Sequence, residues 1–354
     1  KEASEIYNFL IQNKFYDPRV LNNLGSIYSQ IKQFDKAILL FNESIKKFPN
    51  SLEAYSNLAS ILVTKGKSDT AKNILNKAIE LNPNYLKPYS NLASIYVGEG
   101  DFKEAEVLLR KSVGINSKDV NTLVNLGCVL KDLGKPEEAE KFLRNALKIN
   151  PTYEIVLTNL GSVLNELEKI EEGERYLRKA LNINPASPMA LNNLGNILSK
   201  KKNNSEAEFC YRKAIEIKSD FSLAYNNLAS LLSRQGKLSE AEEFIEKAIL
   251  YNPKFELAYV NLGSIKIDLD KLSEAEELFL SAIEINKNYN YAYSNLFRLY
   301  EKTNNISKLK TKIKSLKEDK NIINEILMFK ARISFREKNF TCLLYTSPSP
   351  RDNR

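Results

Sequence analysis

The sequence of 354 residues contains no histidine and no tryptophan, and only three cysteines and two methionines. Histidine is the commonest general base and the commonest metal ligand, so its absence removes both roles. Cys128, Cys210 and Cys342 do not have the spacing of a metal site or of a disulfide framework. The sequence also has no Gly-rich phosphate loop and no nucleophile elbow. We therefore expect no catalytic residue, no metal and no cofactor among the residues present.

The sequence also lacks a long apolar run and a charge excess in its main part. The longest apolar runs are too short to span a bilayer, so we expect no membrane insertion. Residues 1–300 carry 39 Lys+Arg against 38 Asp+Glu, whereas residues 301–340 carry 11 against 5. The net charge of +8 therefore belongs to the end of the chain and does not indicate a nucleic-acid partner. The abundance of Lys, Asn and Ile favours a bacterial protein, which we expect to be cytoplasmic.

What the sequence does contain is a strict repeat. One asparagine recurs every 34 residues without an insertion, at Asn23, Asn57, Asn91, Asn125, Asn159, Asn193, Asn227, Asn261 and Asn295. A fixed period of this size indicates stacked structural repeats that bury their apolar faces against one another.

Small residues recur at fixed places in the same unit. When the asparagine is position 6, position 7 is always Leu, position 8 is Gly or Ala in the first eight units, and positions 20 and 27 are small. Two helices approach closely only where side chains are small, so each unit predicts an antiparallel helix pair. Gly66, Gly100, Gly134 and Gly236 indicate the turn between the two helices. Ser205 three residues before Glu208 predicts a capping box at the start of a second helix, as do the matching Ser–Glu pairs in the next two units.

At nearly every signature position this pattern resembles the tetratricopeptide repeat family. The resemblance implies an all-α fold, a right-handed superhelical solenoid of antiparallel helix pairs. Residues 1–17 then form the second helix of a truncated repeat, and residues 18–289 form eight repeats of 34 residues. Residues 290–340 form a degenerate ninth repeat and capping helices, because Phe297 and Leu309 replace small residues there.

The last residues do not follow the repeat. Residues 342–352 resemble the in-frame translation of a transposase sequencing adapter, so we interpret residues 342–354 as a non-native tail. The natural protein is then expected to continue past Phe340.

The strict spacing of the asparagines indicates a binding role. Positions 2, 6, 9 and 13 lie on one stripe of the first helix, by the three-four spacing of a helix. Asn can donate to and accept from the main chain of an extended peptide, so we hypothesise that the nine asparagines line a concave groove and bind such a peptide. The alternative is a structural role, in which each amide ties one helix to its neighbour. Cys128 occupies position 9 and is interpreted as an inert small residue.

The Asn-Leu-Gly or Asn-Leu-Ala motif at positions 6 to 8 resembles the repeat arm of protein O-GlcNAc transferases. In that family an asparagine ladder binds the substrate polypeptide, and a glycosyltransferase domain follows. Residues 326–332 also resemble bacterial proteins in which such repeats precede a sulfotransferase domain. We therefore predict a protein–protein interaction scaffold of unknown oligomeric state, with no enzyme in the residues present. The alternative is the substrate-recruiting arm of a protein glycosyltransferase or sulfotransferase whose catalytic domain is missing.

Overall fold

The computed structural model describes residues 5–7, 9, 10, 13, 15–305, 307, 308 and 311. The elements bounded within this part are all α-helices, and the chain divides into two compact units, residues 1–185 and 186–354. The N-terminal unit contains α2 (Pro18–Gln30), α3 (Phe34–Lys47), α4 (Leu52–Thr64), α5 (Ser68–Leu81), α6 (Leu86–Glu99), α7 (Phe102–Ile115), α8 (Val120–Asp132), α9 (Pro136–Ile149), α10 (Glu154–Glu166) and α11 (Ile170–Ile183). The C-terminal unit contains α12 (Pro188–Lys200), α13 (Asn204–Ile217), α14 (Ser222–Arg234), α15 (Leu238–Tyr251), α16 (Glu256–Asp268), α17 (Leu272–Ile285) and α18 (Asn290–Lys302).

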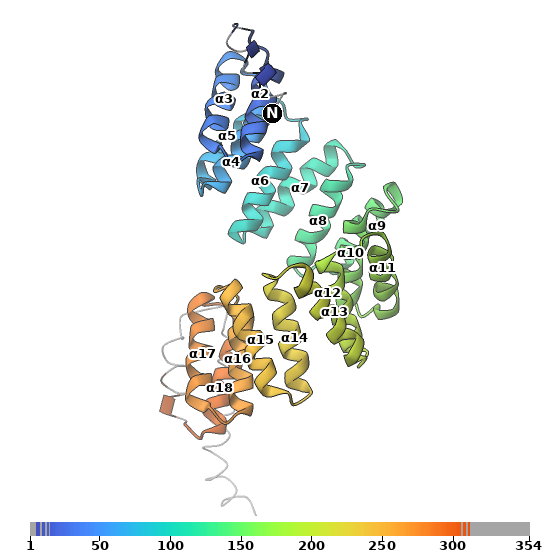
Figure 1. Cartoon of the computed structure of the whole chain (residues 1–354), viewed down its shortest axis with the longest axis vertical. Coiled ribbons are helices and arrows are strands. Elements are labelled where there is room, and N and C mark those ends of the chain that lie inside the picture. The colour runs from blue at the N-terminus through green and yellow to red at the C-terminus, as the bar shows by residue number, and fades with distance from the viewer. Residues whose placement is uncertain are drawn as a thin grey trace, which may run out of the picture. The chain divides into compact units, whose positions relative to one another are not determined.

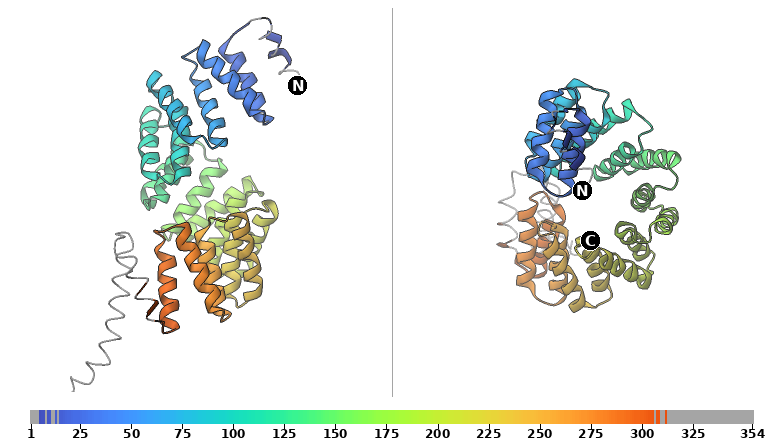
Figure 2. Two further views of the ribbon diagram at one scale, coloured as in Figure 1. Left: turned by 90° about the vertical axis from the view of Figure 1, so that its left-hand side faces the viewer. Right: turned by 45° about the horizontal axis from the view of Figure 1, so that its top comes forward.

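Within each unit the helices form stacked antiparallel pairs (Figure 1; Figure 2). Each even-numbered helix, here called a first helix, packs against the odd-numbered second helix that follows it. First helices of neighbouring repeats also contact each other, as α4 does α6 and α14 does α16. The predicted all-α solenoid of helix pairs is thereby confirmed within each unit.

The close approach of each pair depends on position 8 of the first helix and position 24 of the second. A Cβ atom on Gly195 would lie 2.6 Å from Cε1 of Tyr211, and one on Gly263 would lie 2.5 Å from Cε1 of Phe279. Phe279 is fully buried and Tyr211 almost so. The residue at position 24 therefore occupies the volume that a methyl group at position 8 would need, as leucine also does opposite Gly127 and Gly161.

The turn between the two helices uses a residue in the left-handed region. Gly236 has φ of 78°, and the amide of Lys237 donates to the carbonyl of Leu232 at 3.0 Å, which ends α14. Glycine adopts this conformation without steric cost. Lys202 and Asp270, with φ of 61° and 59°, hold the same place in the neighbouring repeats.

The predicted capping boxes are wrong. α13 begins at Asn204, after Asn203, whose side chain accepts from the amide of Glu206. α15 begins at Leu238 and has no side-chain cap. The left-handed turn leads directly into the second helix, so Ser205 and Ser239 already lie inside the helix and cannot occupy its N-cap.

The second helices are joined by ion pairs that repeat with the period. Arg110 Nη2 lies 2.8 Å from Glu106 on its own helix and 2.5 Å from Glu138 on α9. Lys135 Nζ lies 2.7 Å from Glu106, and its hydrogen bond lowers the pKa of that carboxyl group. The next repeat places Arg144 2.8 Å from Glu140 and 2.9 Å from Glu172. These ion pairs therefore connect the second helices of neighbouring repeats.

The two ends of the chain are only partly described. Residues 5–7, 9 and 10 are helical, within the segment predicted to be a truncated repeat. In α18 Phe297 is fully buried beside Tyr293, with ring centroids 6.1 Å apart. The predicted capping helices after residue 311 and the adapter-like segment 342–354 lie outside the described residues.

Candidate functional site

The face of each first helix that carries positions 2, 6, 9 and 13 is here called the asparagine face. Asn23 and Asn125 are exposed, and the remaining seven position-6 asparagines are partly buried. Each is followed by a buried leucine, as Asn125 is by Leu126, so its position on the helix is fixed. All nine side chains are therefore at least partly accessible to solvent.

Three of these asparagines tie neighbouring first helices together. Asn91 Nδ2 donates to the main-chain oxygen of Ser56 at 3.3 Å. Asn227 Nδ2 donates to Asn192 Oδ1 at 2.9 Å, and Asn261 Nδ2 donates to Asn226 Oδ1 at 2.8 Å. In each case the acceptor is position 5 of the preceding repeat, so one half of the amide has a structural role.

Where position 5 of the preceding repeat is valine, the amide turns to its own helix. Val124 is position 5 of the repeat before that of Asn159, and Asn159 Nδ2 donates to the carbonyl of Ile155 at 3.0 Å. Val260 is position 5 of the repeat before that of Asn295, and Asn295 Nδ2 donates to the carbonyl of Tyr291 at 2.7 Å. A polar residue at position 5 does not by itself produce a bridge, because Asn22 Oδ1 accepts no hydrogen bond from Asn57.

The C-terminal unit extends this tie into an amide network. Asn227 Nδ2 also donates to Asn196 Oδ1 at 3.0 Å, and the Tyr211 hydroxyl donates to the same oxygen at 2.8 Å. Asn226 Nδ2 donates to Asn227 Oδ1 at 3.3 Å, and Asn192 Nδ2 donates to Asn193 Oδ1 at 3.5 Å. Asn192 and Asn226 are almost fully buried. These position-5 asparagines were not predicted, although the Asn-Asn pairs at 192–193 and 226–227 were a signal for them.

The remaining asparagines of the N-terminal unit have other contacts. Asn23 Nδ2 donates to the Tyr7 hydroxyl at 3.0 Å, and Asn57 Oδ1 accepts from Lys87 Nζ at 3.0 Å. Asn125 is exposed and makes no side-chain hydrogen bond to the described residues. The structure therefore places all nine on the same face but does not give them one common hydrogen-bond pattern.

A pocket opens on this face between α4 and α6. It has a volume of ≈ 220 Å³ and is lined by Asn91 together with Ala59, Ser60, Val63, Leu75, Ser94 and Ile95. Asn91 contributes an amide whose Nδ2 is already bound to Ser56. An Asn oxygen can accept two hydrogen bonds, so this amide can still bind a donor that enters the pocket.

Cys128 occupies position 9 of α8 and is partly buried. Burial raises the pKa of its thiol to about 11. Only the thiolate is nucleophilic, so Cys128 is held in its unreactive form at neutral pH.

We expect Cys128 to be alkylated slowly in a Cys210→Ala/Cys342→Ser variant. With its pKa raised, the thiolate fraction at pH 8 falls on the order of a hundredfold below that of free cysteine. Iodoacetamide consumption followed by mass spectrometry from pH 7 to 11 measures this. A rate that reaches half its maximum near the pKa of free cysteine would contradict it.

Lys266 departs from the repeat in the C-terminal unit. It occupies position 11 of α16, where the other repeats have Leu or Tyr, and it is only 8% exposed. Its Nζ lies 2.6 Å from Glu242 Oε1 and forms an ion pair with Glu274, and these hydrogen bonds raise its pKa. The buried charge is thus neutralised by the two flanking second helices.

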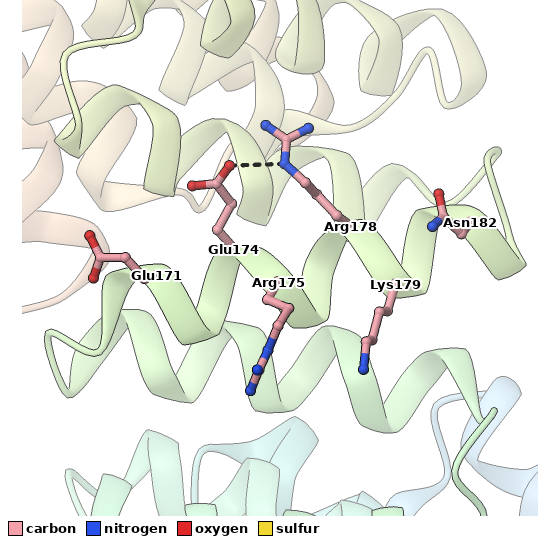
Figure 3. Close-up of a pocket in the computed structure, with 6 residues that line it drawn as sticks. All are labelled: Glu171, Glu174, Arg175, Arg178, Lys179 and Asn182. Carbon is pink, nitrogen blue, oxygen red and sulfur yellow. Dashed lines mark hydrogen bonds and ion pairs between the residues drawn. The ribbon is translucent and has the colours of Figure 1, made fainter.

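A second pocket lies along α11 and is lined by charged and polar residues (Figure 3). Its volume is ≈ 420 Å³, and its lining is Glu171, Glu174, Arg175, Arg178, Lys179 and Asn182. Glu174 Oε1 accepts from Arg178 Nε at 2.9 Å. Its charges are mixed and partly paired, and the pocket shares no residue with the asparagine face. Among the described residues no cluster of His, Cys, Asp and Glu could hold a metal, and no helix is long and apolar enough to cross a membrane.

Models of known protein families match most of the sequence. A family model described as the cilia and flagella-associated protein 70 C-terminal domain, a tetratricopeptide repeat domain, matches residues 2–222, and two tetratricopeptide repeat models match residues 210–243 and 257–289. The chain belongs to the tetratricopeptide repeat family. This fold is typically non-catalytic and uses its stacked repeats as an extended binding surface, so these repeats form a protein-interaction scaffold.

Solved structures agree on the fold. The APC/C hetero-tetramer Cut9–Hcn1 is 15% identical over 75% of this chain, with a TM-score of 0.59, and the chain spans 52% of that chain's length. A tetratricopeptide repeat protein from Parabacteroides merdae is 24% identical over 70% of this chain and 98% of its own, also with a TM-score of 0.59. PilF of Pseudomonas aeruginosa is 21% identical over 61% of this chain and 97% of its own, with a TM-score of 0.50. At these identities the similarity concerns the fold alone. No curated protein matches the chain.

Proposed function

We propose that this tetratricopeptide array binds an extended or disordered polypeptide segment along its asparagine face. The observation that carries the proposal is that all nine position-6 asparagines are accessible on one face of the first helices. An amide offers both a donor and an acceptor, so it can pair with the main chain of a peptide of any sequence. A repeated amide therefore suits a segment without fixed structure.

The hydrogen bonds already present do not remove this capacity. Asn91 and Asn261 use Nδ2 for the neighbouring repeat, and Asn159 uses Nδ2 for its own helix. The Oδ1 atom of each remains an acceptor for an N–H group of a bound segment. The internal bond also fixes the side-chain rotamer, which reduces the conformational entropy lost on binding.

The pocket beside Asn91 adds a place for a side chain. Its lining is apolar at Ala59, Val63 and Ile95 and polar at Ser60 and Ser94. A small or medium apolar side chain of the segment can enter here while its main chain pairs with the asparagines. The alternative role as a transferase arm stays a prediction, because no described residue tests it.

The test uses the two asparagines that tie no other helix. In Asn125→Ala/Asn159→Ala we expect binding to peptides selected from a random twelve-residue display library to weaken at least tenfold. Losing two to four peptide hydrogen bonds of about 1 kcal/mol each accounts for this change. Fluorescence anisotropy of a labelled selected peptide gives the Kd, and thermal melting gives the stability.

The matched control is Asn76→Ala/Asn145→Ala, which changes two exposed asparagines of the second helices α5 and α9. This variant should bind as the wild type does. The melting temperature of the test variant should not fall, because Ala is a better helix former than Asn. Unchanged peptide affinity in Asn125→Ala/Asn159→Ala, or an equal loss in the control, would refute the proposal.

A further inference from the structure

The asparagine face of the C-terminal unit differs chemically from that of the N-terminal unit. At position 2 its first helices carry Met189, Leu223, Leu257 and Tyr291. Met189, Leu223 and Tyr291 are 44%, 40% and 47% exposed, so this is an apolar row open to solvent. In the N-terminal unit the same position holds Arg19, Glu53, Lys87 and Asn121 before Ile155.

The opposite border of the same face is basic. At position 13 the first helices α12, α14 and α18 carry Lys200, Arg234 and Lys302, and Asp268 on α16 is the exception. Arg298 adds a further cation at position 9 of α18. The N-terminal unit has Gln30, Thr64, Gly98, Asp132 and Glu166 at position 13, and none of these is basic.

Three of these cations, Arg234, Arg298 and Lys302, are exposed and form no ion pair with a carboxylate of the described residues. Arg234 donates only to neutral oxygens, from Nη2 to Ser199 Oγ at 2.6 Å and from Nε to the carbonyl of Ser230 at 3.3 Å. Their charge is therefore available to a partner.

The two rows lie on either side of the asparagines. Positions 2 and 13 are eleven residues apart, which is about 16 Å along a helix, and position 6 lies between them. In an extended segment successive side chains point to opposite sides of the main chain. A segment whose main chain crosses the asparagines therefore points alternate side chains toward the apolar row and toward the basic row. The flexible side chains of Lys and Arg at position 13 can reach toward a segment that lies at position 6.

We propose that the C-terminal unit selects an extended protein segment in which apolar and acidic residues alternate. This inference rests on the proposed function, because it uses the asparagines to hold the main chain. Apolar side chains are buried against Met189, Leu223 and Tyr291, and carboxylates pair with Arg234 and Lys302. Charge complementarity sets which segments bind, and the amides supply affinity that does not depend on sequence.

The experiment uses the whole chain and three synthetic twelve-residue peptides with blocked ends. In the first Leu and Asp alternate, in the second Leu and Lys alternate, and the third has the composition of the first with its Leu and Asp residues in two blocks. We expect the first to bind at least tenfold more tightly than the other two at physiological salt. In Arg234→Glu/Lys302→Glu this preference should reverse in favour of the Leu-Lys peptide.

The matched control is Lys254→Glu/Lys287→Glu, which makes the same change of net charge on two exposed loop lysines. It should keep the wild-type preference. Equal loss in both charge variants, or heparin binding as tightly as the Leu-Asp peptide, would overturn the inference, since either result indicates a general polyanion surface. If library peptides bind through Asn125 and Asn159 but the wild type does not distinguish the three peptides, the inference fails and the proposed function stands.

Discussion

Replacing Gly195 with alanine should lower the free energy of unfolding by about 1 to 3 kcal/mol, the usual cost of overfilling a packed core. The added Cβ would lie 2.6 Å from Cε1 and 2.9 Å from Cδ1 of Tyr211. The ring cannot move away cheaply, because it is 2% exposed and its hydroxyl donates to Asn196 at 2.8 Å. Without that conflict the substitution would be favourable, since alanine in a helix is about 1 kcal/mol better than glycine. Urea unfolding followed by circular dichroism measures the change.

A double-mutant cycle with Tyr211→Leu separates the steric cause from a general effect of alanine at this position. Other repeats already combine alanine at position 8 with a smaller residue at position 24, as in the buried pairs Ala59 with Leu75 and Ala229 with Ile245. In the Tyr211→Leu background the penalty of Gly195→Ala should therefore be clearly smaller, although not absent, because Leu143 and Leu177 also lie close to the glycine at position 8 of their repeats. An equal penalty in both backgrounds would show that the ring is not the cause.

Much of the fold could be predicted from the sequence because the period and the small residues act locally. The predicted repeats begin at Pro18 and Pro188, among others, and α2 and α12 begin at the same residues. The physical reason is that proline suits the first position of a helix and that small residues permit only one close approach per pair. The pairing of glycine with an aromatic residue sixteen positions later was present in the sequence at Gly25 and Phe41, but only the contact distances give it a meaning.

The orientation of the amides could not be predicted from position 6 alone. Asn159 and Asn261 occupy the same place in their repeats, yet one donates to its own helix and the other to the preceding repeat. The residue at position 5 of the preceding repeat, Val124 or Asn226, is 35 residues earlier and belongs to a different helix. Lys266 is a similar case, because the carboxylates that permit its burial come from two other helices. Both features depend on contacts between helices and not on a helix's own pattern.

Because Asn227 bonds to a neighbouring repeat and Asn159 bonds within its own helix, replacement by alanine should have unequal effects at the two positions. Asn227→Ala should lower the free energy of unfolding by about 2 to 4 kcal/mol, because it removes several hydrogen bonds and leaves the buried oxygen Asn192 Oδ1 without a donor. Asn227 Nδ2 donates to Asn192 Oδ1 at 2.9 Å and to Asn196 Oδ1 at 3.0 Å. Asn226 Nδ2 loses its acceptor as well. Urea unfolding, together with amide hydrogen exchange in α12 and α14, measures the loss and locates it.

The control is the same substitution at Asn159, which should change the free energy of unfolding by less than about 0.5 kcal/mol, as expected of a site without a buried partner. Asn159 donates only to the carbonyl of Ile155 within its own helix, so no other helix depends on it. If the two variants lose equal stability, the tie between position 6 and position 5 is not a stabilising interaction. If Asn227→Ala is destabilising and Asn159→Ala is not, one recurring residue type has two roles: Asn227 holds neighbouring repeats together, and Asn159 is left for a partner.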